Sequence, residues 1–243
     1  MIPVALAWSG GKDSSLALAA LRRDPTVEVV ALLTTITRDF DRISMHGVRR
    51  SVLEAQVAAL GLPLVEAGIP AAASNAIYEQ ALATALTELR RHYPDLRHLA
   101  FGDLFLEDVR AYRELVLPPL GWTPLFPLWG QDTGALARDF VLSGFRAVLT
   151  CVDTEQLQAT FAGREFDATL LAELPATVDP CGERGEFHTC VFDGPIFSHP
   201  LPLRVGTRVR RDGRFEYCDV TLVNLQDKSL EQLADASPAS RSE

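Results

Sequence analysis

Over the first 153 residues, short apolar runs alternate with longer stretches in which apolar residues recur at helical spacing. This alternation is typical of a parallel sheet whose strands are connected by helices. We therefore expect an α/β fold, with a doubly wound and mostly parallel sheet, in a nucleotide-binding domain spanning residues 1–153. The six strands predicted in it cover residues 4–8, 27–34, 62–67, 99–103, 123–128 and 147–152. The helices predicted between them cover residues 14–21, 48–60, 77–91, 108–117 and 133–142.

Beyond residue 153 the pattern changes, because five prolines interrupt the chain between residues 175 and 202. Segments rich in β-forming residues occur at 189–192 and 215–223. These features predict a smaller α+β appendage over residues 154–226, which we expect on the substrate side of the site. The last segment, 227–243, has little apolar content to bury, so we expect a disordered tail there.

The composition disfavours several classes of protein. The 243 residues are 47% hydrophobic, too many for a disordered chain, and no apolar run reaches the length of about 18 residues that spans a membrane. The net charge of −9 argues against a broad contact with nucleic acid or an anionic membrane. The first residues lack the basic start of a secretory signal, and the four cysteines lie far apart. We therefore expect a cytoplasmic protein with reduced thiols.

A glycine-rich turn follows the first predicted strand, with the sequence Ser9-Gly10-Gly11-Lys12-Asp13-Ser14. Such a turn directs backbone N–H groups and the positive end of a helix dipole to one point, where a phosphate fits. The glycines allow close approach, and the serine hydroxyls can donate further hydrogen bonds. The turn differs from the loop of nucleoside triphosphatases, because Asp13 follows Lys12 and Leu6 replaces the first glycine, and it lacks the third glycine of the dinucleotide fingerprint. An ordinary helix N-cap is the alternative.

This turn resembles the pyrophosphate loop of the ATP pyrophosphatase superfamily, whose members have a Rossmann-like fold of the adenine nucleotide α-hydrolase type. The resemblance implies that ATP is cleaved between its α and β phosphates, that a substrate oxygen takes the adenylyl group and that pyrophosphate leaves. It implies that the loop residues bind ATP, that Lys12 neutralises the leaving pyrophosphate and that Asp13 binds Mg²⁺, which prefers oxygen ligands. The alternatives are a solvated lysine and an aspartate that only complements the helix dipole.

Four further regions resemble one branch of that superfamily, the diphthine–ammonia ligase-like proteins. They are Ser44-Met45-His46-Gly47-Val48, Gly102-Asp103-Leu104 with Tyr112-Arg113, Phe126-Pro127-Leu128-Trp129, and Gly182-Glu183-Arg184-Gly185-Glu186-Phe187-His188-Thr189 with Val191-Phe192-Asp193-Gly194-Pro195. The sequence of the last region is the most specific to this branch of the superfamily. In eukaryotic and archaeal members the chemistry is ATP-dependent amidation of diphthine on elongation factor 2. The segment 102–108 departs from the usual Gly-Ala-Ile-like start and resembles bacterial-type members, so the resemblance retains the ATP chemistry and leaves the acceptor open.

Two of these regions follow predicted strands at the carboxyl edge of the sheet, where open α/β sheets bind ligands. We expect His46 and Gly47 near the adenine or ribose of ATP, and Gly102 against the nucleotide. Asp103 would meet the metal ion or the amine nucleophile. A loop turn for the first pair and a helix cap for Asp103 are the alternatives. Among the arginines, Arg113 is favoured to hold a carboxylate.

Glu183, Glu186 and His188 form the densest group of titratable side chains in the sequence. Residues two apart in an extended segment share a face, so Glu186 and His188 can act on one ligand as base, ammonia ligand or substrate anchor. The alternative is a hydrogen-bonded pair that joins the appendage to the first domain. A zinc site of Cys181, His188 and Cys190 is disfavoured, because the spacing matches no common site.

Together these features predict an ATP-dependent amide ligase that uses ATP and Mg²⁺, adenylates a carboxylate and transfers ammonia to it. The predicted catalytic residues are Lys12, Asp13, Asp103, Glu186 and His188. We expect a small-molecule or protein-borne carboxylate as acceptor and no nucleic acid or membrane partner, and a homodimer is compatible with the sequence. Two alternatives stay open: an adenine-nucleotide-binding or sensing module without turnover, and a tRNA-modifying enzyme of the same superfamily, which the acidic charge disfavours.

Overall fold

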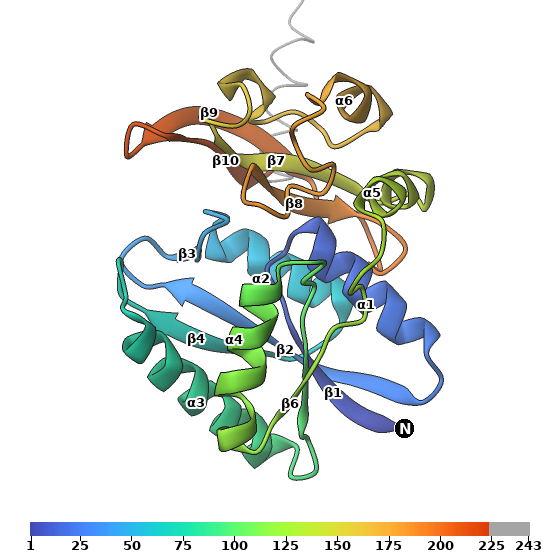
Figure 1. Ribbon diagram of the computed structural model, residues 1–243, viewed down its shortest axis with the longest axis vertical. Coiled ribbons are helices and arrows are strands. Elements are labelled where there is room, and N and C mark those ends of the chain that lie inside the picture. Colours follow the sequence, from blue (N-terminus) through green and yellow to red (C-terminus); the bar gives the residue numbers. More distant parts are fainter. Residues whose placement is uncertain (224–243) are drawn as a thin grey trace, which may run out of the picture.

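The computed structural model describes residues 1–223, which form two sheets stacked one above the other (Figure 1). The segment 227–243, expected to be disordered, lies outside the described residues. The first sheet contains β1 (Ile2–Ala7), β2 (Val27–Thr37), β3 (Arg42–Ile43), β4 (Leu64–Ile69), β5 (His98–Ala100) and β6 (Thr123–Leu125). Its helices are α1 (Lys12–Arg23), α2 (Arg50–Leu60), α3 (Asn75–His92) and α4 (Glu107–Val116), followed by a 3₁₀ turn at Pro118–Leu120.

The first sheet is mostly parallel. Strands β4, β2, β1, β5 and β6 pair in parallel, and the short β3 pairs antiparallel with the end of β2. Helices α1 and α2 lie between the two sheets, whereas α3 covers the opposite face (Figure 1). This arrangement confirms the predicted doubly wound, mostly parallel sheet.

Residues of β1 alternate between two hydrophobic cores, which explains why helices cover both faces. Val4 and Leu6 pack in the core that includes α1, α2 and the second sheet, whereas Ala5 packs in the core that includes Leu86 of α3. Because successive side chains of a strand point to opposite faces, a strand buried on both sides reads as a continuous apolar run. The larger core continues from the first sheet into the second without interruption.

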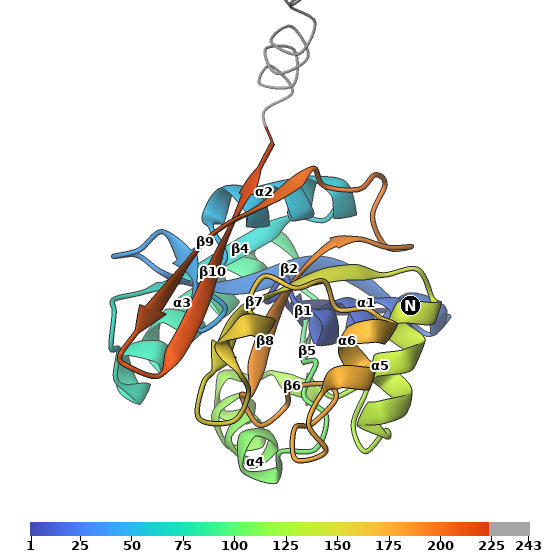
Figure 2. The same cartoon turned by 90° about the horizontal axis from the view of Figure 1, so that it is seen from above.

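The second sheet is antiparallel, with strand order β8-β7-β10-β9. Seen from above, it lies over the first sheet (Figure 2). Its strands are β7 (Arg146–Asp153), β8 (Phe187–Asp193), β9 (Leu203–Arg211) and β10 (Phe215–Leu222), and the accompanying helical segments are α5 (Thr133–Leu142), a 3₁₀ turn at Ala159–Phe161 and α6 (Ala168–Glu173). The four cysteines are buried and form no disulfide. No helix in residues 1–223 is long and apolar enough to cross a membrane.

The prediction that residues 147–152 form a sixth strand of the parallel sheet is wrong. These residues belong to β7, which pairs antiparallel with β8 and β10 of the second sheet. The sequence misled because all but the first residue of β7 are buried, and a buried apolar run looks the same in either kind of sheet. We propose that the boundary between the two units precedes β7, instead of following residue 153.

Candidate functional site

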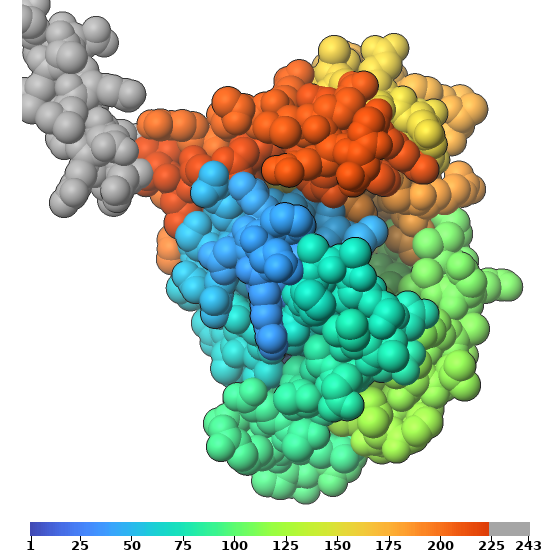
Figure 3. Space-filling model, turned by 90° about the vertical axis from the view of Figure 1, so that its left-hand side faces the viewer, coloured from blue at the N-terminus to red at the C-terminus, as the bar shows by residue number. Residues whose placement is uncertain are grey.

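A cavity of about 730 Å³ lies at the carboxyl ends of β1, β2 and β5, where the second sheet covers this edge. In the space-filling view, the blue segment after β2 and the teal helix α3 lie beneath the red strands of the second sheet (Figure 3). The predicted site residues that line the cavity are Ser9, Lys12, Asp13, Ser14, His46, Gly102, Asp103 and His188. Four others, Gly10, Gly11, Gly47 and Glu186, are not part of its lining.

The glycine-rich turn connects β1 to α1 without an ordinary side-chain cap. Gly10 has a φ of +74°, a left-handed conformation that glycine adopts without steric cost. Gly11 is the N-cap residue of α1, and its carbonyl accepts hydrogen bonds from the hydroxyls of Ser14 and Ser15, both at 2.9 Å. The serine hydroxyls thus shape the turn from within, and the N-terminal end of α1 points at the cavity wall.

Strand β8 of the second sheet holds this turn in place. The hydroxyl of Thr189 accepts a hydrogen bond from the backbone N–H of Lys12 at 3.0 Å, and the N–H of Val191 donates to the carbonyl of Gly10 at 2.8 Å. The buried amide of Gln56, on α2, donates to the same carbonyl at 3.0 Å and to that of Val191 at 2.7 Å. Thr189 and Gln56 are therefore structural parts of the phosphate loop that sequence reasoning missed.

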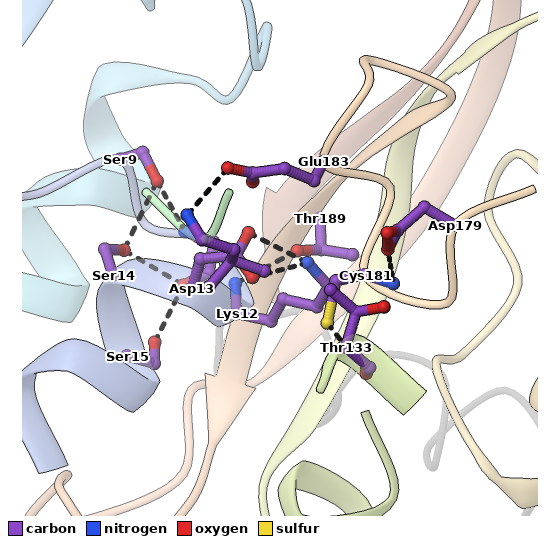
Figure 4. A network of polar contacts seen from close by, with 12 residues as sticks. Ser9, Lys12, Asp13, Ser14, Ser15, Thr133, Asp179, Cys181, Glu183 and Thr189 are labelled. Carbon is purple, nitrogen blue, oxygen red and sulfur yellow. Dashed lines mark hydrogen bonds and ion pairs between the residues drawn. The ribbon is translucent and has the colours of Figure 1, made fainter. Parts of the chain in front are cut away.

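Lys12 places a buried positive charge beside the turn (Figure 4). Its side chain is 2% exposed, and Nζ contacts the two carboxylate oxygens of Asp13 at 2.6 and 2.8 Å. Burial alone would lower the pKa of Lys12, but the adjacent carboxylate outweighs it, so the pKa lies above its ordinary value. A fixed ammonium group at this position is suited to an anionic ligand.

Gly102 lets the end of β5 approach the start of α1. A Cβ atom on this residue would lie 2.8 Å from the carbonyl carbon of Asp13, so the two segments touch backbone to backbone. Asp103, the next residue, accepts a hydrogen bond from Nε of Arg113 at 3.3 Å, and the same guanidinium donates to the hydroxyl of Tyr78 at 3.3 Å. These three side chains all line the cavity.

Glu183, and not Glu186, is the glutamate of the segment 182–189 that lines the cavity. One carboxylate oxygen of Glu183 accepts a hydrogen bond from the backbone N–H of Leu104 at 2.7 Å, and the residue lines the cavity. Burial raises the pKa of Glu183 to about 7, so this carboxyl can exchange a proton near neutral pH.

Glu186, by contrast, is 1% exposed and faces away from the cavity. Its carboxylate accepts hydrogen bonds from the backbone N–H groups of Asp179 and Arg184, both at 2.9 Å. The structure therefore does not bring Glu186 and His188 to one ligand. Glu186 fixes the turn before β8 within the second unit, and these bonds do not join the appendage to the first domain as the alternative considered from the sequence supposed.

His46 and His188 meet at the cavity wall, with ring centroids 4.6 Å apart. Gly47, next to His46, is a packing residue: a Cβ atom there would lie 2.8 Å from the ring of Tyr217.

Comparison with known families agrees with this architecture. The model of the diphthamide synthase N-terminal domain matches residues 2–122, and that of the diphthamide synthase C-terminal domain matches residues 132–221. The chain belongs to the diphthamide synthase family. The resemblance identified in the sequence is thereby confirmed, and the interval between the two family domains precedes β7.

Two curated relatives of this chain carry the name diphthine–ammonia ligase. The protein of Schizosaccharomyces pombe is 28% identical over 215 residues, which cover 80% of this chain and 35% of that protein. The protein of Danio rerio is 26% identical over 212 residues, which cover 79% of this chain and 83% of that protein. The chain therefore spans about a third of the length of the first relative and most of the second.

Proposed function

We propose that this chain is an ATP-dependent ligase that adenylates a carboxylate and transfers ammonia to it, with release of AMP and pyrophosphate. The observation that carries the proposal is the ion pair of the buried Lys12 with the partly exposed Asp13, beside the glycine-rich turn at the wall of a cavity of about 730 Å³. This volume lies within the range of about 300–1,000 Å³ usual for small-molecule sites. The names of the relatives support the same reaction class.

The pyrophosphate end of the substrate would lie against the N-terminus of α1. In the first step a carboxylate oxygen bonds to the α-phosphorus, and the bond from that phosphorus to the bridging oxygen of the β-phosphate breaks. Negative charge then develops on pyrophosphate, and the ammonium of Lys12 stabilises it from a fixed, buried position.

Asp13 is suited to contribute a carboxylate oxygen to Mg²⁺, which neutralises phosphate charge when bound. This ion is usually held by one or two carboxylates together with substrate phosphates. Residues 1–223 contain no group of three acidic, histidine or cysteine side chains arranged to hold a metal alone, so the phosphates would complete the site.

Glu183 is the residue of this chain best placed to accept a proton from the attacking nitrogen. In the second step ammonia bonds to the acyl carbon, the bond to AMP breaks, and one proton of the nitrogen passes to a carboxylate. Arg113, oriented by Asp103 and Tyr78, offers a guanidinium to the acceptor carboxylate. Diphthine, named for the relatives, is the first acceptor to test.

The test is to incubate the purified chain with ATP, Mg²⁺, ammonia and a carboxylate acceptor, or a cell extract, and to separate the products by chromatography. We expect AMP, pyrophosphate and an amidated species. Release of ADP and phosphate, or binding of ATP with no turnover under any acceptor, contradicts the proposal. Asp13→Asn should keep the fold and lose Mg²⁺-dependent turnover, whereas the exposed Asp139→Asn serves as the matched control.

A further inference from the structure

The two cavity histidines are held as a pair by three elements of the fold. His46 follows β3 and His188 lies on β8, and their rings are inclined by 42° at a centroid distance of 4.6 Å. The buried hydroxyl of Thr150, on β7, lies 3.1 Å from the carbonyl oxygen of His46 and 3.4 Å from that of His188. Thr150 thus fixes both backbones relative to each other.

The pair lies against the phosphate loop. A Cβ atom on Gly11 would be 3.2 Å from Cε1 of His46. Thr189, the neighbour of His188, accepts a hydrogen bond through its hydroxyl from the backbone N–H of Lys12. Nδ1 of His46 is buried and has no hydrogen-bond partner among the described residues. Buried polar atoms are rarely left without a partner, so this nitrogen points to a ligand that supplies one.

The charges around the pair favour an anionic ligand. Burial lowers the pKa of His46 well below its ordinary range, and the neighbouring His188 and Lys12 lower it further, whereas the backbone of Thr189 opposes this effect. Burial and the charge of Lys12 lower the pKa of His188 to about 4. Both imidazoles are therefore neutral at pH 7 in the unliganded chain, and an anion placed against them would raise their pKa values.

We infer that His46 and His188 receive the distal phosphates of ATP, or the pyrophosphate formed from them, and that binding of this anion brings one proton from solvent onto the imidazole pair. This inference rests on the proposed function. One proton is expected instead of two, because a second positive charge at this ring separation would be repelled by the first and by Lys12. The protonated pair would add to the positive charge that faces the departing pyrophosphate.

The size of the effect follows from the charges. An opposite charge within hydrogen-bonding distance raises a pKa by about 1–3 units. His188 would then titrate between about 5 and about 7, starting from about 4. At pH 6 this range corresponds to an uptake of about 0.1 to about 0.9 proton beyond that of a variant without His188.

Inorganic pyrophosphate and adenosine are the probes that test this inference. The chain has five histidines, so the Cε1 proton resonances can be assigned by single substitutions, with the exposed His92 and His199 as internal references. We expect pyrophosphate to shift the His46 and His188 resonances toward the protonated form and adenosine to leave them unchanged. Calorimetry in two buffers of different ionisation enthalpy then counts the protons taken up.

Three variants complete the design. His188→Asn should abolish the excess proton uptake, and His199→Asn should leave it unchanged. Thr150→Val should reduce the uptake, and circular dichroism should show that this variant stays folded. Pyrophosphate binding without a histidine shift, or with equal uptake in wild type and His188→Asn, overturns the inference and leaves the proposed function standing. A response to adenosine alone would move His46 to the nucleoside end and also overturns it. Failure of the folded chain to bind either ATP or pyrophosphate overturns both proposals.

Discussion

The buried amide of Gln56 connects three parts of the molecule, and replacing it with leucine tests how the phosphate loop is held. Its oxygen accepts a hydrogen bond from Nε1 of Trp8 at 3.2 Å, and its nitrogen donates to the carbonyls of Gly10 and Val191. The residue is fully buried, so no water can replace these partners. The loop, α2 and β8 therefore share one amide group.

The expected cost of Gln56→Leu can be worked out bond by bond. The indole N–H of Trp8 would be left buried without its acceptor, which costs about 1–3 kcal/mol, and each of the two lost bonds to carbonyls costs about 0.5–1.5 kcal/mol. The Gly10 carbonyl keeps the bond from the N–H of Val191, and the leucine adds apolar burial, so both terms fall toward the lower end. We expect the free energy of unfolding to fall by about 3 kcal/mol.

Urea denaturation measures this change, with Gln131→Leu as the matched control. Gln131 is exposed and its side-chain amide donates to the nearby carbonyl of Pro127, so its replacement should change stability by less than about 0.5 kcal/mol. Because the loop loses one of the donors that fix Gly10, pyrophosphate affinity of Gln56→Leu should fall about tenfold or more, equivalent to about 1.4 kcal/mol. A stability loss under about 1 kcal/mol together with unchanged affinity would refute the reasoning.

Three further outcomes are expected. Gly102→Ala forces a Cβ atom against the first turn of α1, so thermal denaturation should reveal a loss of about 1–3 kcal/mol and a titration should reveal weaker ATP binding; normal values for both would contradict the close contact. The hydrogen bonds from Arg214 hold the pKa of Asp153 at about 2, opposed by burial, so its carboxylate stabilises the fold fully above about pH 4 and this contribution is lost as the pH falls toward 2. The free energy of unfolding of Asp153→Asn should therefore be about 2 kcal/mol below that of the wild type at pH 7, a value reduced for the exposure of Arg214. This difference between the two proteins should shrink in acid. An equal difference in urea titrations at pH 2.5 and pH 7 would argue against the ion pair. Glu183→Gln should lower the rate of amide formation by about 10²- to 10⁴-fold with little change in the KM for ATP, whereas the exposed Glu88→Gln should leave both unchanged, and equal rates in the two variants would remove Glu183 from the chemistry.

The features that sequence reasoning predicted well are those that depend on neighbouring residues in the chain. The glycine-rich turn was placed correctly because a strand, a turn and a helix start follow one another within about a dozen residues. The predicted helix at 133–142 has the same bounds as α5, since Asp132 caps it and accepts the N–H of Ala135 at 2.7 Å. Local propensity and local capping agree there, so no distant contact was needed.

The features that sequence reasoning missed depend on contacts between segments that are distant in the chain. Thr189 and Lys12 are 177 positions apart, and nothing near either residue in the sequence announces the hydrogen bond between them. The sequence analysis assigned the site glutamate to Glu186, whereas Glu183 lines the cavity, and this error has a local cause. β8 begins at Phe187, so Glu186 belongs to the preceding turn, where the alternation of strand residues that we assumed does not apply.

The dependence of the phosphate loop on β8 has a consequence for how the chain acquires its site during synthesis. Residues 9–14 leave the ribosome early, yet two of the groups that fix this turn, the hydroxyl of Thr189 and the N–H of Val191, are added only after most of the chain has been made. Domains generally fold in order of their emergence. A nascent chain that ends before β8 can form the parallel sheet and still carry an unsupported loop, so ATP binding should begin late in translation, and chains arrested before residue 189 should bind it far more weakly than chains arrested beyond residue 223.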